Sequence, residues 1–293
     1  MKNKILWTAI ITPMLENKNI DFDSLNNIIQ YQNNMDCGIV LLGSTGEGLS
    51  LKVEEKQKIV EFVNELDLKV PILVGVGGFN LEEQIKWIKF CNTKKIDGYL
   101  VVTPMYSKPG PQGQYHWFKK ILDFSVKPCM LYNVPSRTGV EIDPSVLNTL
   151  QDHDNMWSLK DASGISSKYL EYKKCAPNIF YYSGEDGLVP SFKKQEITGL
   201  VSVVSNIWPK QSKKYVEMCL NDEINNNSQE WWKDLASSCF TASNPVPVKK
   251  WMAYKKIIKS DMVRPPLSPK DMKGLNDLMK SDSMIKSWYK SLY

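Results

Sequence analysis

The chain has 293 residues, of which 42% are hydrophobic, and it carries a formal charge of +5. This composition excludes a disordered chain and leaves room for one large α/β barrel or for two ordinary domains. The lysines are interspersed with acids, and no apolar run approaches the roughly 20 residues of a membrane span, so we expect neither a nucleic-acid nor a membrane partner.

Strand-like and helix-like segments alternate along the first 220 residues. Short apolar runs rich in Ile, Val and Leu predict strands, and segments with a helical period between them predict helices. Strands are expected at residues 5–11, 38–42, 72–75, 98–102, 130–133, 156–160, 180–184 and 200–203. Helices are expected at residues 23–35, 52–66, 81–93, 114–125, 144–150, 168–176, 188–195 and 209–220.

Apolar strands that alternate with helices are typical of a parallel sheet covered on both faces, and eight such units favour a closed (β/α)8 TIM barrel. The strand pattern stops after Asn221, and an Asn-rich run at residues 225–228 precedes helical segments rich in Trp and Lys. We therefore expect a catalytic barrel at residues 1–224 and a C-terminal helical extension at residues 225–293.

Polar clusters follow the predicted strands. Residues 43–48 follow the second strand, Tyr106 follows the fourth, residues 132–139 span the end of the fifth, Lys160 ends the sixth, and residues 184–186 end the seventh. In a parallel barrel these positions share one rim, which is where barrel enzymes carry their chemistry. The pattern thus predicts one active site at that rim.

Lys160 is the most informative of these residues. It closes a mostly apolar run and is followed at once by small and turn-forming residues. Burial disfavours an ammonium and lowers its pKa, which makes such an amine a candidate nucleophile toward a carbonyl. The alternative is a lysine that reaches solvent or pairs with Asp161. The shared rim favours the catalytic interpretation.

The other clusters are compatible with structural as well as functional roles. The loop at residues 43–48 is either an ordinary turn or a carboxylate site, in which glycines let backbone N–H groups approach and two hydroxyls donate. Arg137 is either a solvated residue of a turn or a bidentate carboxylate clamp. Tyr132 and Tyr106 are aromatic side chains that would also suit simple packing at the rim.

Histidines and cysteines give no pattern of a metal site. His116 and His153 fall in or beside predicted helices away from the rim, which argues against a Ser-His-Asp triad or a histidine-bound metal. The six cysteines are scattered without a Cys-x-x-Cys pair, and the apolar run at residues 5–11 is too short for a secretory signal. We expect a cytoplasmic protein without a metal.

Three motifs resemble those of the dihydrodipicolinate synthase family, which belongs to the pyruvate-dependent class I aldolases. They are Gly-Ser-Thr-Gly-Glu at residues 43–47, Tyr-Asn-Val-Pro-Ser-Arg-Thr-Gly at 132–139 and Leu-Lys-Asp-Ala-Ser-Gly at 159–164, with an echo, Asn-Pro-Val-Pro-Val-Lys, at 244–249. The resemblance implies condensation of pyruvate with L-aspartate 4-semialdehyde to 4-hydroxy-tetrahydrodipicolinate, a step of lysine (diaminopimelate) biosynthesis.

The resemblance also implies catalytic roles. Lys160 would form a covalent imine with pyruvate, so that no separate cofactor is needed. Tyr132 would act as general acid and base, and Ser44 would pass protons on toward Tyr106, which in this family reaches into the active site of a neighbouring subunit. The resemblance also implies the usual assembly of the family, a homotetramer built from two tight dimers.

Substrate-binding roles follow from the same resemblance. Thr45, together with the backbone near Val201, would hold the pyruvate carboxylate, and Gly184 is expected in the same substrate-binding set. Arg137 would bind the second carboxylate at the mouth of the site. This Arg-Thr-Gly sequence separates the chain from relatives that cleave sialic acid.

Two alternatives remain at this point. Ser44 stands where most members of the family carry Thr, and serine is common in sialic-acid lyases, so one alternative is a pyruvate aldolase that acts on a sugar-derived 2-keto acid. The other is a non-catalytic barrel that serves as a regulator or scaffold.

Residues that bind feedback lysine in bacterial members are largely replaced. Val53, Lys56, Phe79 and Met105 stand where imidazole, amide and phenol groups are found in the family, and only Glu83 is kept. We therefore expect lysine to inhibit this protein weakly or not at all.

Overall fold

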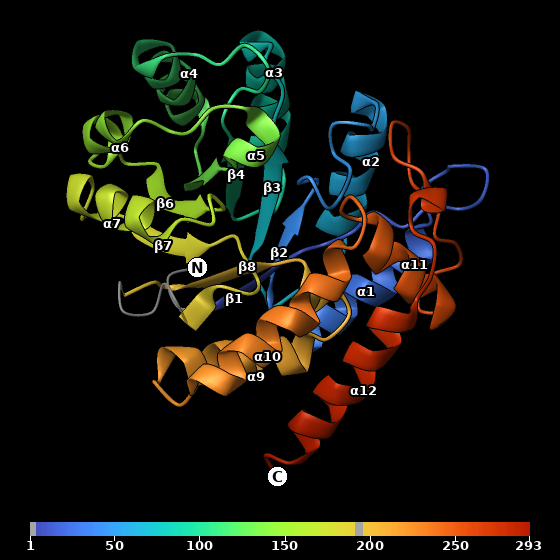
Figure 1. The fold of residues 1–293 in the computed structure, drawn as a ribbon. Coiled ribbons are helices and arrows are strands. Elements are labelled where there is room, and N and C mark those ends of the chain that lie inside the picture. Colours follow the sequence, from blue (N-terminus) through green and yellow to red (C-terminus); the bar gives the residue numbers. More distant parts are fainter. Residues whose placement is uncertain (1–3, 191–195) are drawn as a thin grey trace.

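The computed structural model describes residues 4–190 and 196–293, and its centre is a closed barrel of parallel strands in the order β1 to β8 (Figure 1). The strands are β1 (Leu6–Ala9), β2 (Gly38–Leu41), β3 (Ile72–Val76), β4 (Gly98–Val102), β5 (Cys129–Asn133), β6 (Met156–Asp161), β7 (Phe180–Ser183) and β8 (Gly199–Ser202). Nearly every strand residue is buried, because one face fills the barrel and the other lies under helices. The predicted TIM barrel is confirmed.

Helices follow the strands and cover the outside of the barrel. They are α1 (Phe22–Asn34), α2 (Val53–Asn64), α3 (Leu81–Asn92), α4 (Pro111–Phe124), α5 (Pro135–Thr138), α6 (Pro144–Leu150), α7 (Ser166–Cys175) and α9 (Pro209–Leu220). Asp21 caps α1 by accepting the Ser24 N–H at 3.2 Å. The helix predicted at residues 188–195 falls mostly on 191–195, which lie outside the described residues.

The barrel interior has its own apolar cluster, separate from the larger core beneath the helices. Trp7 packs edge-on against Trp157 with ring centroids 5.8 Å apart, and Trp157 packs against Tyr182 at 5.6 Å. Tyr132 and Val201 belong to the same cluster. Because these side chains fill the interior, a ligand can enter only at the mouth of the barrel.

Strand β6 contains a bulge that sets the direction of its last side chains. Cys129 of β5 lies opposite Met156, but the next residue of β5 lies opposite Ser158, so Trp157 is an extra residue in β6. Beyond the bulge, Tyr132 lies opposite Lys160. Partners in register point to the same face of a sheet, so Lys160 shares the inner face with Tyr132.

The C-terminal region consists of α10 (Asn226–Ser237), α11 (Val246–Tyr254) and α12 (Asn276–Lys290), and it lies against α1 and α9 (Figure 1). The boundary predicted after residue 224 falls in the connection between α9 and α10. Tyr215 of α9 stacks on Trp232 of α10 with centroids 4.0 Å apart, and Trp288 of α12 packs edge-on against Trp232 at 6.0 Å. These aromatic contacts join the C-terminal helices to the barrel.

One local prediction was wrong. The segment that carries Arg137, expected to be a loop, forms the one-turn helix α5, with Pro135 at its start and Gly139 at its end. Gly139 has φ of 73°, a left-handed conformation that ends helices and favours glycine.

In the described part of the chain, no helix is long and apolar enough to cross a membrane.

Candidate active site

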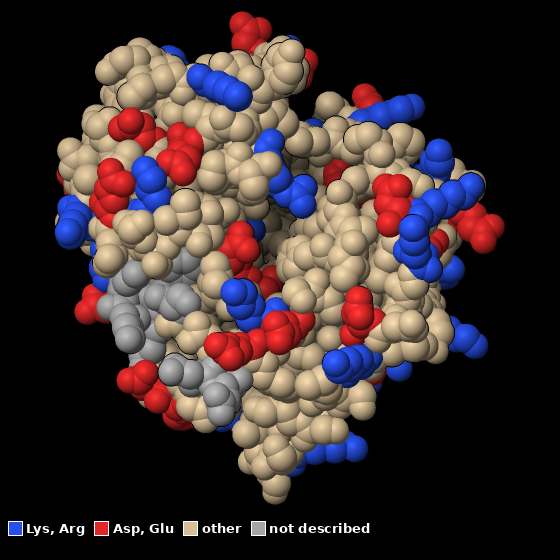
Figure 2. Space-filling view, in the orientation of Figure 1, with Lys and Arg blue, Asp and Glu red and all other residues tan. Residues whose placement is uncertain are grey.

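A cavity of about 330 Å³ opens at the carboxyl ends of β2 to β5. The space-filling view shows it as a hollow below α5, with charged side chains of both signs near its margin (Figure 2). Ser44, Tyr132 and Arg137, all predicted site residues, line this cavity, and Asn244 from the C-terminal region joins them. The carboxyl rim therefore carries the cavity that the barrel topology predicts.

Lys160 lies beside the cavity, in contact with Tyr132. Its Nζ is 4.1 Å from the centroid of the Tyr132 ring, and only 5% of the residue is exposed. Burial lowers the pKa of Lys160 to about 8, although the charges of Asp186 and Glu185 oppose that shift. At pH 7 roughly one amine in ten is then neutral, which is the form that attacks a carbonyl.

Tyr132 stays protonated at neutral pH. Burial raises the pKa of its hydroxyl to about 12, and the positive charge of Arg137 opposes this shift. Its backbone carbonyl accepts a hydrogen bond from the Thr103 hydroxyl at 3.2 Å, which ties the end of β5 to the end of β4. The structure thus places the ring of a protonated phenol against the Lys160 amine.

Two carboxyl groups follow β7 near Lys160. Burial, together with the negative charge of the neighbouring Asp186, raises the pKa of Glu185 to about 7. Asp186 accepts hydrogen bonds from the Ser202 hydroxyl and from the Val203 N–H at 2.9 Å. The charges of both groups favour the ammonium form of Lys160, so they hold its pKa from falling further.

Gly184 makes room for the Lys160 side chain. A Cβ built at this position would lie 2.8 Å from Cε of Lys160 and 2.7 Å from Cβ of Ala162. Both distances are too short for carbon atoms, so a larger residue would displace the lysine. The structure therefore gives this glycine, expected to bind substrate, a steric role as well.

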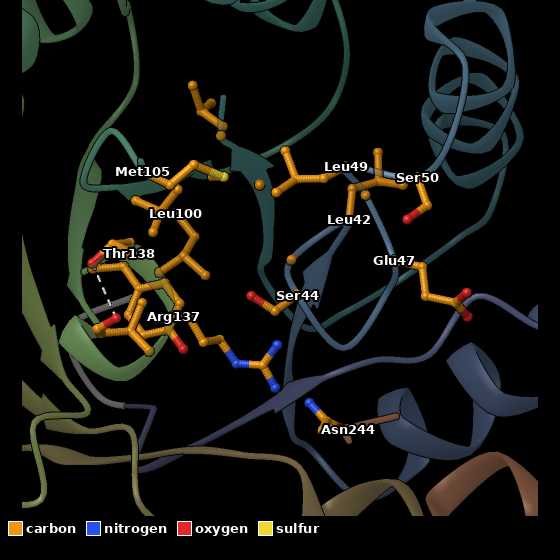
Figure 3. A pocket seen from close by; sticks show the side chains of 18 of the residues that line it. Leu42, Ser44, Glu47, Leu49, Ser50, Leu100, Met105, Arg137, Thr138 and Asn244 are labelled. Atoms are coloured by element: carbon orange, nitrogen blue, oxygen red, sulfur yellow. Dashed lines mark hydrogen bonds between the residues drawn. The ribbon is translucent and has the colours of Figure 1, made fainter. Parts of the chain in front are cut away.

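The loop after β2 presents Ser44 to the cavity, while Thr45 is buried behind it. The side-chain amide of Asn244 donates to Oγ1 of Thr45 at 2.8 Å. In the close-up view, the guanidinium of Arg137 points toward the space between Ser44 and Asn244 (Figure 3). Cationic and hydroxyl groups thus face one cavity, an arrangement suited to a carboxylate.

Tyr106 and the side chain of Val201 do not line the cavity. Tyr106 is 90% exposed and is not among the residues that line the cavity, although its backbone N–H donates to the Thr138 carbonyl at 3.3 Å. Val201 is fully buried in β8, within the interior cluster. A single chain therefore does not bring the Tyr106 hydroxyl to Lys160.

Sequence reasoning did not assign roles to Asn244, Glu47 or Lys249. Lys249 and Glu47 form an ion pair in which the Lys249 side chain has no exposed surface. In the sequence, Asn244 and Lys249 belong to the family-like motif at residues 244–249. The position of this motif in the chain gave no reason to place it beside residues 43–48. The histidines lie outside this cavity, with His153 paired to Asp123 at 3.2 Å.

The residues compared with the lysine-binding positions divide into two groups. Lys56 and Met105 line the cavity, whereas Val53, Phe79 and Glu83 are exposed. Lys56 Nζ lies 5.0 Å from the centroid of the Trp87 ring, and burial lowers the pKa of this amine. At these two positions the cavity is therefore lined by a cationic and an apolar side chain.

Comparisons with known proteins agree with this geometry. The model of the dihydrodipicolinate synthetase family matches residues 2–284. A curated 4-hydroxy-tetrahydrodipicolinate synthase from Francisella philomiragia subsp. philomiragia is 47% identical over 287 residues, which cover 98% of this chain and 97% of that protein.

Solved structures match over almost the whole chain. The 4-hydroxy-tetrahydrodipicolinate synthase of Methylacidiphilum fumariolicum SolV has a TM-score of 0.89 at 28% identity, with 97% of this chain and 96% of that chain covered. A chloride-inhibited dihydrodipicolinate synthase from Acinetobacter baumannii, complexed with pyruvate, has a TM-score of 0.86 at 27% identity and covers 97% and 98% of the two chains. From the barrel, the rim residues and these matches together, the chain belongs to the dihydrodipicolinate synthetase family.

Proposed function

We propose that this protein is a 4-hydroxy-tetrahydrodipicolinate synthase, which condenses pyruvate with L-aspartate 4-semialdehyde in lysine (diaminopimelate) biosynthesis. The observation that carries the proposal is the buried Lys160 amine, with its pKa lowered to about 8, held over the Tyr132 ring at the rim of the barrel. Its curated relatives carry the name of this activity, and the Acinetobacter baumannii structure holds pyruvate.

The reaction begins at Lys160. Its neutral Nζ attacks C2 of pyruvate, and loss of one water gives an imine. The protonated imine withdraws electrons, so the methyl carbon loses a proton and the resulting enamine adds to the aldehyde carbon of the semialdehyde. The amino group of the added semialdehyde then attacks the imine carbon, closes the ring and releases Lys160. No cofactor takes part in this sequence.

Proton transfers fall to the hydroxyl groups at the rim. Tyr132, whose pKa is raised to about 12, donates a proton to the departing hydroxyl of the carbinolamine and recovers it from the substrate. Ser44, on the wall of the same cavity, passes protons on toward Tyr106. We propose these three residues, with Lys160, as the catalytic set.

Substrate carboxylates are held by two separate groups. Thr45 and the backbone near Val201 bind the pyruvate carboxylate, next to Gly184. Arg137 binds the carboxylate of the semialdehyde, because its guanidinium points into the cavity across from Ser44 (Figure 3). The position of the Arg137 cation on the cavity wall supports the second of these assignments.

Assembly completes the proposed site. The 90% exposure of Tyr106 in one chain suits a residue that works in the active site of a second copy. We therefore propose a homotetramer built as two dimers, in which each dimer exchanges Tyr106 side chains.

A second candidate is a pyruvate aldolase for a sugar-derived 2-keto acid, and Ser44 is the observation that favours it. Both candidates form the same imine, so the aldehyde partner distinguishes them. Turnover with pyruvate and aspartate semialdehyde, compared with pyruvate and a sugar aldehyde, decides between the two.

Borohydride reduction in the presence of pyruvate tests the shared mechanism. Reduction should fix the imine as a stable adduct, which peptide mass analysis should locate on Lys160 and nowhere else. Lys249 is a matched internal control, because it is equally buried but paired with Glu47. Samples without pyruvate and the Lys160→Met variant should carry no adduct. Absence of an adduct on wild-type Lys160 would overturn the proposal.

A further inference from the structure

The loop that carries Ser44 and Thr45 is fixed by contacts from outside its own strand. Within the loop, the Glu47 N–H donates to the Ser44 carbonyl at 3.1 Å and the Gly48 N–H donates to the Gly43 carbonyl at 3.2 Å. The side chains of Thr45 and Glu47 make hydrogen bonds outside the loop. Both side chains are met by the C-terminal region.

Glu47 is held at both carboxylate oxygens. Oε1 forms the buried ion pair with Lys249, and Oε2 accepts the Arg264 N–H at 2.7 Å. Lys249 donates in addition to the Met262 carbonyl at 2.8 Å. Because both members of this buried pair make a further hydrogen bond to the C-terminal region, that region fixes the position of this loop.

Five residues before Lys249, the side chain of Asn244 meets the same loop. Asn244 is 6% exposed, lines the cavity, and donates from Nδ2 to Oγ1 of Thr45 at 2.8 Å. Its Oδ1 has no hydrogen-bond partner within residues 4–190 and 196–293, and an unpaired buried acceptor is costly. The contact with Thr45 is therefore the one polar interaction that this amide makes there.

The direction of this hydrogen bond decides what the Thr45 hydroxyl can do. A hydroxyl has one hydrogen to donate and two lone pairs that accept. Because the Asn244 amide occupies a lone pair, the hydrogen of Thr45 stays available for another acceptor. A carboxylate, which only accepts, is the matching partner for that hydrogen.

We propose that Asn244 is a positioning residue, which turns the hydroxyl hydrogen of Thr45 toward the pyruvate carboxylate, while the Lys249–Glu47 pair keeps the loop in place. The inference rests on the proposed function, in which Thr45 binds that carboxylate. It makes the C-terminal segment at residues 244–249 part of the pyruvate site, although no residue of this segment forms the imine.

The test measures the pyruvate concentration that gives half-maximal adduct formation in the borohydride assay. Asn244→Ala removes the donor and should raise this concentration about tenfold, a loss of about 1.4 kcal/mol. Asn244→Asp keeps the shape but accepts the hydrogen of Thr45 and adds a negative charge, so it should raise the concentration further. At saturating pyruvate, the amount of adduct should equal that of the wild type, because the imine chemistry is intact.

A double-mutant cycle shows whether Asn244 acts through Thr45. In the Thr45→Val background, Asn244→Ala should have little further effect on half-saturation, since the hydroxyl is already gone. Asn155→Ala is the matched control, because it removes two hydrogen bonds, to the Leu122 and Ser125 carbonyls, just before β6 and far from the rim. It should leave half-saturation unchanged.

The outcomes separate this inference from the proposed function. Wild-type protein that forms no adduct refutes the proposed function itself. Wild-type adduct with unchanged half-saturation in Asn244→Ala, or an effect that adds fully to that of Thr45→Val, refutes the positioning role alone. Thermal unfolding of each variant identifies loss of fold, and the isosteric Asn244→Asp variant then decides the question.

Discussion

Replacing Lys249 with Met probes the buried ion pair that joins the C-terminal region to the rim. Methionine is similar in length and suits an apolar environment, but it cannot pair with Glu47. The wild-type side chains of Lys249 and Glu47 are 0% and 1% exposed, so water cannot replace the lost partner without a rearrangement. The substitution therefore leaves an uncompensated carboxylate in the interior.

The expected loss of stability follows from these contacts. Removing one partner of a buried pair costs about 3–5 kcal/mol, because the other charge remains unpaired. Glu47 keeps its bond from the Arg264 N–H, and burial lowers the pKa of Lys249, so the wild-type ammonium already carries a desolvation cost. We therefore expect a loss near the lower end, about 3 kcal/mol, which lowers Tm by about 5 °C in a chain of this size.

Thermal and urea unfolding, followed by circular dichroism, measure this loss. The double variant Lys249→Met with Glu47→Gln should recover part of it, since no unpaired charge is left. A loss below about 1 kcal/mol in the single variant would contradict the argument about the buried charge. A double variant that is no more stable than Lys249→Met would show that packing, and not charge, causes the effect.

Four further predictions concern activity. The rate of adduct formation should rise with pH up to about 8 and then level off, because only the neutral form of Lys160 attacks pyruvate and its pKa is about 8; a rate that is flat from pH 6 to pH 9 would contradict this. Gly184→Ala should lower turnover by about tenfold or more, as the new Cβ displaces Cε of Lys160; turnover equal to that of the wild type would exclude this steric role. Tyr106→Phe should lower turnover by about 10²-fold and leave pyruvate adduct formation largely intact; unchanged turnover would remove Tyr106 from the proton relay. Added L-lysine should inhibit turnover only weakly, since the cation of Lys56 on the cavity wall repels the lysine ammonium. Strong inhibition at lysine concentrations below one millimolar would contradict this prediction.

The barrel and most of its rim could be predicted because they depend on local patterns. Each strand is a short apolar run between helical segments, and parallel closure places every strand end on one side. Lys160, Tyr132 and Arg137 could therefore be assigned to one site before any coordinates were known. The one-turn helix that carries Arg137 is too short to show a helical period, although its Pro and Gly were visible as boundary signals.

Long-range partners could not be predicted in this way. Asn244 and Lys249 lie about 200 residues from Thr45 and Glu47, and no periodicity in the C-terminal region shows that the chain returns to the rim. The surroundings of Tyr106 depend on a second copy of the chain under the proposed assembly, so neither the pattern nor a single chain defines them. Packing of the whole molecule decides these contacts.

The extra residue at Trp157 has a consequence for how this barrel tolerates changes in the length of β6. In a regular strand, side chains separated by three positions project to opposite sides, yet Trp157 and Lys160 both project inward. Deleting Trp157 would place Met156 and Ser158 opposite the consecutive residues Cys129 and Met130, which restores regular alternation and leaves Lys160 facing inward. Deleting Leu159 instead would shift Lys160 by one position and turn its amine outward among the helices.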